Sequence, residues 1–512
     1  MTGRTGSCPS CGAPIEFRNA ATVLVVCASC GGASTRKGLD FEKLGKVAEI
    51  TPLDSLLDLG TSGRFEGRTW TAVGQVQLDH GSGPWNEWCL LFDDGTWGWL
   101  GEAQGEILVT RPVAALPVPP HGKVHPGDAV DLGAAGAFVA AEVGRARIAA
   151  VRGELPVPVR PGGTRLYADL RKGTDGFATL DYGDDQTCDA IFVGRRVTPA
   201  DAGLDPSRAP AAPERRAEGV RIQCPQCGGE IPLRDPEGSV RVGCASCGSL
   251  LDPRDPKAGV LGMATRLRTA TLLPLGARGK LRGLDVEVIA HLVRSVTVDG
   301  TRYPWGEYLL KVAKGGGYRW LSESNGHWTF LEPISLGEVT QSSGSATVRG
   351  ERFKHFQGGT AVVDAVFGEA YWAVEVGEKA QSEDYVRPPR LVSVETSGKE
   401  RNATLGEYCP PEEIAAAFAL KKPLREPDGA GACQPNPFKA VLRKWWLVCS
   451  LFAAADLVTL IVAASSDREV PGFPCCLTLP ILLFPALVVS TRAWNFEVAR
   501  WSESDHPLVQ SG

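Results

Sequence analysis

Alternating apolar and polar positions fill residues 50–200 and 262–420, and glycine-rich turns separate the runs. This period of two predicts short β-strands joined by tight turns. The densest run is Tyr303–Trp328, and an earlier version of it stands at Gly83–Gly105. In both, aromatic runs flank a turn that contains glycine, which is typical of a β-hairpin with a packed aromatic face. The pattern therefore predicts two copies of one β-rich module.

The pattern changes near the C-terminus, where two apolar stretches, 445–464 and 473–491, flank the polar segment Ser465–Gly472. Each stretch matches the thickness of a bilayer if helical, so the pattern predicts a hairpin of two transmembrane helices. A buried pair of core helices is the competing interpretation. The basic residues outside the stretches favour the membrane and place both termini in the cytoplasm. They are Lys439, Arg443, Lys444, Arg492 and Arg500.

Asp456 lies near the middle of the first apolar stretch. A carboxylate there costs roughly 2.5–3.5 kcal/mol on insertion scales, so it needs a partner or a proton. One interpretation makes Asp456 an assembly or proton-sensitive contact. The other makes it a tolerated polar residue, and both stay open.

Composition narrows the class of protein. A chain of 512 residues predicts roughly three or four folded units, and an apolar share of 43% is enough for real cores. The net charge of −5 argues against a protein that binds nucleic acid through bulk electrostatics. The N-terminus, MTGRTGSCPSCG, has no apolar segment typical of a secretory signal.

Eight of the fifteen cysteines form four Cys-Xaa-Xaa-Cys pairs, and glycine follows the second cysteine of each pair. A knuckle that wraps a metal needs a positive φ there, which glycine adopts without steric cost. Two such knuckles close a tetrahedral site with four thiolates, so we expect two structural Zn²⁺ ions. The alternative, a thioredoxin-like redox pair, lacks its βαβ context. The predicted ligands are Cys8, Cys11, Cys27 and Cys30 in the first site and Cys224, Cys227, Cys244 and Cys247 in the second.

These patterns predict a mainly β fold with two tandem units, each a four-cysteine zinc ribbon followed by an antiparallel β sandwich or barrel-like module. A two-helix transmembrane hairpin follows them. The expected order is zinc ribbon 1 at 1–37, β module 1 at 50–200, a linker at 201–221, zinc ribbon 2 at 222–253, β module 2 at 262–420, a linker at 421–437, transmembrane helices at 445–464 and 473–491, and a cytoplasmic tail at 492–512.

An acid follows a tryptophan at the same place in both aromatic hairpins, as Trp85-Xaa-Glu87 and Trp305-Xaa-Glu307. Together with Trp320, these residues are the candidate ligand or structural cluster. A functional interpretation places the acids in an aromatic cleft that faces a cationic amine. The favoured interpretation is structural: each glutamate accepts hydrogen bonds from a neighbouring strand and fixes its hairpin.

Two signatures follow each four-cysteine ribbon: Pro-Trp-Xaa-Glu-aromatic, at 84–88 and 304–308, and Trp-Leu-Xaa-Glu, at 99–102 and 320–323. This arrangement resembles a bacterial family known only as domain of unknown function forty-one seventy-eight. The C-terminal hairpin and the motif that begins at Asn495-Phe496-Glu497 also resemble the C-terminal part of family members that carry a membrane tail. The resemblance implies the fold, but it supplies no catalytic residues. Its relatives are often encoded beside polyamine-synthesis and membrane-stress genes, which implies such a context.

The sequence thus predicts a protein anchored in the bacterial inner membrane, with a non-catalytic binding or scaffolding role on the cytosolic side. Its expected partners are the lipid bilayer and other proteins at the membrane. One alternative is a small-ligand sensor or enzyme that uses an aromatic–acid cleft around Glu307, which a convergence of Glu323 and His327 on that acid would favour. The other is nucleic-acid binding through the ribbons, which would require a basic face that their loops do not show.

Overall fold

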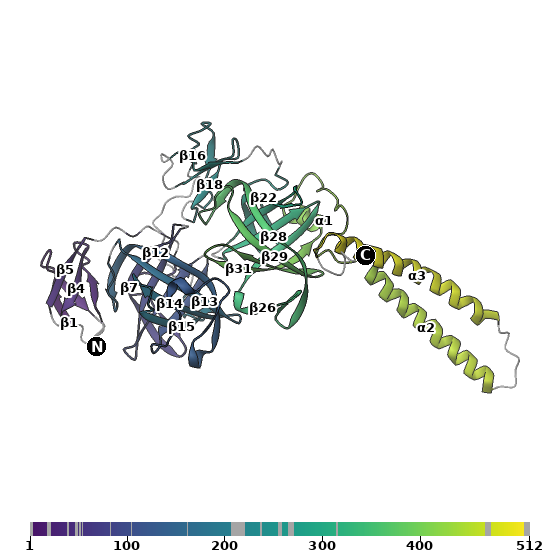
Figure 1. The fold of residues 1–512 in the computed structure, drawn as a ribbon, viewed down its shortest axis with the longest axis horizontal. Helices are drawn as coiled ribbons and strands as arrows, with labels where there is room; N and C mark the ends of the chain where they lie inside the picture. Colours follow the sequence, from purple (N-terminus) through teal and green to yellow (C-terminus); the bar gives the residue numbers. More distant parts are fainter. Residues whose placement is uncertain are drawn as a thin grey trace.

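The structure is a computed structural model of the chain. It describes residues 4–17, 22–37, 40–46, 50, 53, 55–81, 83–103, 105–160, 162–205, 221–235, 238–253, 259–264, 271–313, 316–465 and 473–505. Two β barrels lie side by side, each with a small ribbon of short strands, and a pair of long helices projects from the second barrel (Figure 1).

Barrel 1 is a ring of antiparallel strands in which β12 pairs with both β13 and β7 and so closes the sheet. Around the ring the order is β7 (Arg68–Asp79), β8 (Pro84–Phe92), β9 (Trp97–Ala103), β10 (Glu106–Pro112), β15 (Ala190–Val197), β14 (Gly176–Gly183), β13 (Thr164–Lys172) and β12 (Ala137–Leu155). Closure leaves no free edge among these strands, so the backbone groups of the ring are paired.

Barrel 2 repeats this topology, and β28 closes it by pairing with both β29 and β22. Its order is β22 (Leu284–Val298), β23 (Thr301–Val312), β24 (Tyr318–Ser324), β25 (His327–Ile334), β31 (Arg401–Cys409), β30 (Arg390–Thr396), β29 (Lys379–Arg387) and β28 (Glu351–Ala370). The predicted mainly β fold and its two repeated modules are confirmed, and the modules are barrels rather than sandwiches.

Tight turns of one kind join several neighbouring strands. Glu66-Gly67, Arg282-Gly283 and Asn325-Gly326 each place both residues at positive φ. This backbone conformation matches the twist of the flanking strands, and glycine at the second position makes it accessible. The first two turns occupy equivalent places in the two barrels, after β6 (Ser62–Phe65) and β21 (Arg278–Leu281).

The barrel interiors are filled, and other segments cover the outer faces. In barrel 1, side chains from strands all round the ring, such as Val76, Trp99 and Tyr167, form one apolar cluster inside. In barrel 2, α1 (Pro411–Ala417) packs Ile414 against one outer face. The hairpin of β26 (Val339–Ser342) and β27 (Ser345–Val348) covers another. In barrel 1, β11 (Ala129–Asp131) and the loop before it have the same role.

The ribbons are continuous with the barrels. The end of β12 pairs with β3 of ribbon 1, and the end of β28 pairs with β18 of ribbon 2. Ribbon 1 holds β1 (Arg4–Ser7), β2 (Pro14–Phe17), β3 (Leu24–Val26), β4 (Gly32–Lys37) and β5 (Asp40–Lys46). Ribbon 2 holds β16 (Arg221–Gln223), β17 (Glu230–Pro232), β18 (Arg241–Gly243), β19 (Ser249–Leu251) and β20 (Gly262–Met263).

A Gly-Glu pair marks the place where each long strand leaves its barrel. Gly153 and Gly368 both have positive φ, and a Cβ on either would meet a backbone oxygen of the neighbouring strand within 2.3 Å. The next residue reaches into the ribbon. Glu369 is fully buried and accepts hydrogen bonds from the backbone N–H groups of Arg234 and Asp235, and Glu154 accepts one from Thr22. Burial raises the pKa of Glu369.

The C-terminal helices α2 (Pro437–Ser465) and α3 (Phe473–Ser502) pack on each other as an antiparallel hairpin, which we call the helical hairpin. Both are longer than the stretches 445–464 and 473–491. Among the residues that the structure describes, no helix carries an apolar stretch long enough to cross a membrane. The turn expected at 466–472, and the side chains of 473–482 in the second stretch, lie outside the described residues.

The base of the helical hairpin is bonded to barrel 2. The Arg500 side chain is fully buried and donates to the carbonyl oxygens of Ala432 and Gln434, at 2.8 and 2.6 Å. Cys433, within the segment expected to be a linker, is buried against Thr329 of β25. These contacts fix the helices to the barrel instead of leaving them on a free tether.

We expect Glu369→Ala to lower the free energy of unfolding of the full chain by about 3 kcal/mol. The change leaves two backbone N–H groups and the Ser239 hydroxyl without their acceptor, and each unpaired buried group costs about 1–3 kcal/mol. Urea denaturation followed by tryptophan fluorescence measures the loss. The matched control is Glu230→Ala, which removes an exposed acid of the same ribbon and should cost less than about 0.5 kcal/mol. Equal effects of the two changes would refute the role of Glu369.

Candidate metal centres and buried acid networks

Each ribbon brings its four cysteine sulfurs together, as the spacing predicts. All four sulfurs of a group lie within 4.8 Å of one another. Knuckle hydrogen bonds shape the site: Gly12 N–H donates to Cys8 O, and Gly228 N–H donates to Cys224 O, both at 2.8 Å. The glycines after all four pairs have positive φ. One cysteine of each first pair, Cys11 or Cys227, is exposed, and its partner is buried.

The sulfur separations match a tetrahedral thiolate site. Cys8 and Cys30 are 3.7 Å apart, and Cys11 and Cys27 are 3.8 Å apart. The corresponding pairs of ribbon 2 are 3.6 and 3.8 Å apart. A tetrahedron of sulfurs at the Zn–S distance of about 2.3 Å has edges of about 3.8 Å. Both groups therefore fit one tetrahedral metal ion each.

The repeated acids Glu87 and Glu307 point into the two barrels, and each is bonded to its own tryptophan. The Trp85 indole N–H donates to Glu87 at 3.2 Å, and that of Trp305 donates to Glu307 at 2.7 Å. Glu307 also accepts from Arg294 at 3.2 Å. Burial raises the pKa of both carboxyls.

Two further acids repeat inside the barrels. The first is Asp169, which accepts from Thr179, and its counterpart Asp384, which pairs in register with Ser393. Burial is the main cause that raises the pKa of Asp169, to about 7, and it raises the pKa of Asp384 as well. Neither acid was among the site residues predicted from the sequence.

The second repeated acid pairs with an arginine, and this arginine lies on a different strand in each barrel. Asp181 of β14 pairs with Arg165 of β13. Its counterpart Glu395 of β30 pairs with Arg294 of β22. The two barrels thus share three interior acids and one arginine. The shared pattern Thr-Leu-Asp at 179–181 and Ser-Val-Glu at 393–395 is the sequence signal that could have revealed these acids.

The expected cleft around Glu307 includes Trp305 but does not bring Glu323 or His327 to that acid. Trp305 and Trp320 are half-buried, and Trp320 packs edge-on against Trp372. Glu323 accepts from the Gly326 N–H in the following turn, and His327 contacts the carbonyl oxygen of Asp428. Glu307 is held inside the barrel, while these two residues belong to a turn at its end.

A buried histidine in barrel 2 replaces a glutamine of barrel 1. His291 and Gln75 occupy the same register position, opposite Tyr308 and Trp88. The imidazole stacks on Tyr308 at 4.4 Å, and its Nδ1 atom has no hydrogen-bond partner among the described atoms. Burial lowers the pKa of His291 to about 4.

Asp456 of α2 is half-buried and lines a small cavity of about 180 Å³ between the helices, together with Ser450 and Leu483. The helical hairpin also presents many large apolar side chains to its surroundings. They include Trp446, Leu447, Leu451, Phe452, Leu457, Val458, Ile461, Phe484, Leu487 and Trp494.

Comparison with known proteins gives one match. The model of the family described as "Domain of unknown function (DUF4178)" matches residues 58–199 and 274–411, which correspond to the two barrels. No curated protein and no solved structure matches the chain.

We expect the purified chain to hold two metal ions, and Cys224→Ser to reduce the content to one. A three-thiolate remnant binds metal more weakly, and loss of the ion unfolds its ribbon because metal binding and folding are coupled. Elemental analysis measures the ratio. Cys188→Ser, which changes a cysteine outside both groups, is the control and should leave two ions. Equal metal content in the wild type and Cys224→Ser would count against the site.

We expect acid to destabilise barrel 2 through His291. The unfolded chain takes up a proton near pH 6.5, whereas the folded His291, with its pKa of about 4, does not. Stability is therefore lost as the pH falls from 6.5 to 4, by up to about 3 kcal/mol. His291→Gln installs the residue of barrel 1 and should remove this part of the pH dependence. Urea unfolding of both proteins across this range measures the difference, and parallel curves would contradict it.

Proposed function

Because this chain belongs to the family described as "Domain of unknown function (DUF4178)", whose description assigns no activity, we propose its function from the geometry alone. It is a non-catalytic scaffold that the helical hairpin tethers to the inner face of a bacterial membrane. There it holds two barrels and two zinc ribbons within reach of protein partners.

The exposed apolar surface of the helical hairpin carries this proposal. Leu447 and Leu451 are 63% and 64% exposed, and Phe484 and Leu487 of the other helix are equally open. A continuous apolar surface of this kind is unfavourable in water and marks a site for a membrane or a partner. Lipid chains are the occupant we favour, because exposed cations flank the apolar part at the base of the helical hairpin. These are Lys439, Arg443, Lys444 and Arg492.

The bonded base gives the tether a fixed geometry. Asn436 donates to Ala493 O at 2.9 Å, and Asp505 accepts from the Gly358 N–H of β28 at 2.8 Å. Phe356 packs on Trp501, with ring centres 5.6 Å apart. A barrel held in this way keeps one orientation towards the lipid surface, which suits a scaffold that presents a defined face.

The chemistry of the residues that the two copies share favours binding over catalysis. Four thiolates leave no open coordination position, so zinc in the ribbons would be structural. The acids inside the barrels are bonded to arginine, tryptophan or hydroxyl partners. A reducing cytosol keeps such thiolates available for the metal.

We expect the full-length protein to float with lipid vesicles in a density gradient. The double variant Leu451→Arg/Val458→Arg should lose this association, since each arginine costs roughly 2.5–3.5 kcal/mol at the centre of a membrane helix. Both positions are exposed, so the barrels should still unfold cooperatively at the wild-type temperature. Leu261→Arg, an exposed apolar position in ribbon 2, is the control and should still float. Flotation of the double variant would refute the membrane tether.

Labelling of intact cells tests the orientation. A single cysteine introduced at Ser466 should react with an impermeant thiol reagent, and one introduced at Ser511 should not, because the basic flanks keep both termini in the cytoplasm. The opposite labelling pattern would overturn this orientation without affecting the tether itself.

A further inference from the structure

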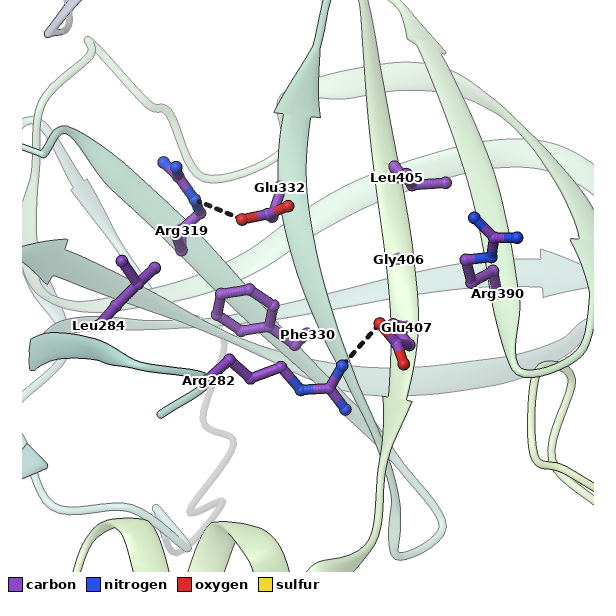
Figure 2. A pocket seen from close by; sticks show the side chains of 9 residues that line it. All are labelled: Arg282, Leu284, Arg319, Phe330, Glu332, Arg390, Leu405, Gly406 and Glu407. Carbon is purple, nitrogen blue, oxygen red and sulfur yellow. Dashed lines mark hydrogen bonds and ion pairs between the residues drawn. The ribbon is translucent and has the colours of Figure 1, made fainter. Parts of the chain in front are cut away.

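A pocket of about 310 Å³ opens on the outer face of barrel 2 (Figure 2). Its base is apolar and includes Phe330, which is buried, and its rim is charged. Figure 2 shows the charged side chains that line the pocket, which come from β24, β25, β30, β31 and the turn before β22. They are Arg282, Arg319, Arg390, Glu332 and Glu407.

The three arginines are held in different ways. Arg282 is fully bonded: it contacts Glu407 at 2.7 Å and Glu413 at 3.0 Å and donates to Tyr408 O at 2.9 Å. Arg319 has one acid, Glu332, at 3.2 Å. Arg390 is paired with Glu351, which does not line the pocket.

Barrel 1 shows which of these residues the fold itself requires. The glycine of β15 that corresponds to Gly406 is Gly194, so Arg195 corresponds to Glu407, and Glu66 corresponds to Arg282. Arg195 and Glu66 also form an ion pair, at 3.6 Å. The pair therefore occurs in both barrels with its charges exchanged, which identifies Arg282–Glu407 as a structural contact.

The other two arginines have no counterpart in barrel 1. Register places Gly98 where barrel 2 has Arg319, and Gly176 where it has Arg390. In addition, Arg111 stands where barrel 2 has Glu332, and its guanidinium lies 3.9 Å from the ring of Phe92, over the same part of the surface. Barrel 2 has the small Val312 in place of Phe92. Barrel 2 thus has an open space with Arg319 and Arg390 at its rim where barrel 1 places Arg111 over Phe92.

We propose that this pocket binds a small organic oxyanion, a phosphate or carboxylate joined to an apolar group. The apolar group lies over Phe330, and the anion binds the guanidinium group of Arg319 or of Arg390 at the rim. Guanidinium groups recognise both oxyanions through paired charge-assisted hydrogen bonds. This site does not depend on the membrane tether or on zinc.

Guanidinium chemistry and size support an anion of this class. The lining arginines are paired with the lining acids Glu332 and Glu407 and with Glu351 outside it, so an oxyanion would compete with these carboxylates for the guanidinium groups. Arg319 and Arg390 are each about one-quarter to one-third exposed, so they are accessible to a ligand. A volume near 300 Å³ is at the lower end for ligand sites, which suits a molecule of about ten heavy atoms.

Calorimetric titration of the purified full-length protein tests the site with phenyl phosphate, benzoate and phenol as probes. We expect saturable binding of at least one of the two anions and binding of phenol that is at least about tenfold weaker, because phenol lacks the charge. The tighter anion identifies the source as a phosphate or a carboxylate. Arg319→Gln or Arg390→Gln, whichever removes the anion's guanidinium partner, should weaken binding about tenfold or more.

Arg278→Gln is the matched control, since Arg278 is an exposed arginine of the same barrel that pairs with Glu287 outside the pocket. It should change the affinity by less than about twofold. Thermal unfolding of each variant confirms that the barrel is intact, and Arg319→Lys, which keeps the charge, should retain part of the affinity. The proposal is overturned if neither anion binds the wild type, if phenol binds equally well, or if both glutamine variants bind as the control does.

Discussion

One shared strand in each half of the chain holds the fold together. β12 and β28 each close a barrel and then continue into a ribbon, so the metal-type site and the barrel belong to one hydrogen-bonded sheet. The transition depends on glycine with positive φ, where a side chain would strike the next strand, and on a buried glutamate that accepts hydrogen bonds from the ribbon. Besides this pair, strand pairing and the hydrogen bond from Tyr318 to Asp235 hold ribbon 2 in position.

The sequence predicted what local chemistry determines. Cysteine spacing led to both thiolate groups, and alternation with glycine turns led to the aromatic hairpins. Closure of the barrels could not be predicted from local patterns because it joins strands such as β7 and β12, which lie far apart in the chain. The strand junction was visible, however, as Ala-Val-Arg-Gly-Glu at 150–154 and Ala-Val-Phe-Gly-Glu at 365–369. The segment at the base of the helical hairpin was predicted to be a linker. Its contacts, such as that of Arg500 with Ala432, join distant positions and so leave no local pattern.

The two copies share charged residues in the barrel interior and differ on the outer surface. Inside, three acids and one arginine recur, although the arginine comes from β13 in one barrel and from β22 in the other. The ion pair persists through a change of strand, which indicates that this interior acid requires a cationic partner, since an uncompensated buried charge is costly. Outside, the copies diverge: barrel 1 covers its surface with Arg111, and barrel 2 leaves the corresponding region open. The second barrel also carries the helices.

The exchanged ion pair has a consequence for how the chain folds. Tandem copies with the same topology can pair strands across copies, and such swapped species are a known failure of repeat proteins. If the β6 turn of barrel 1 packed on the β31 strand of barrel 2, Glu66 would meet Glu407. The reciprocal error would bring Arg282 against Arg195. Like charges at close range oppose both errors, whereas each correct pairing joins opposite charges. The inverted ion pair therefore disfavours strand pairing between the two halves of the chain during folding.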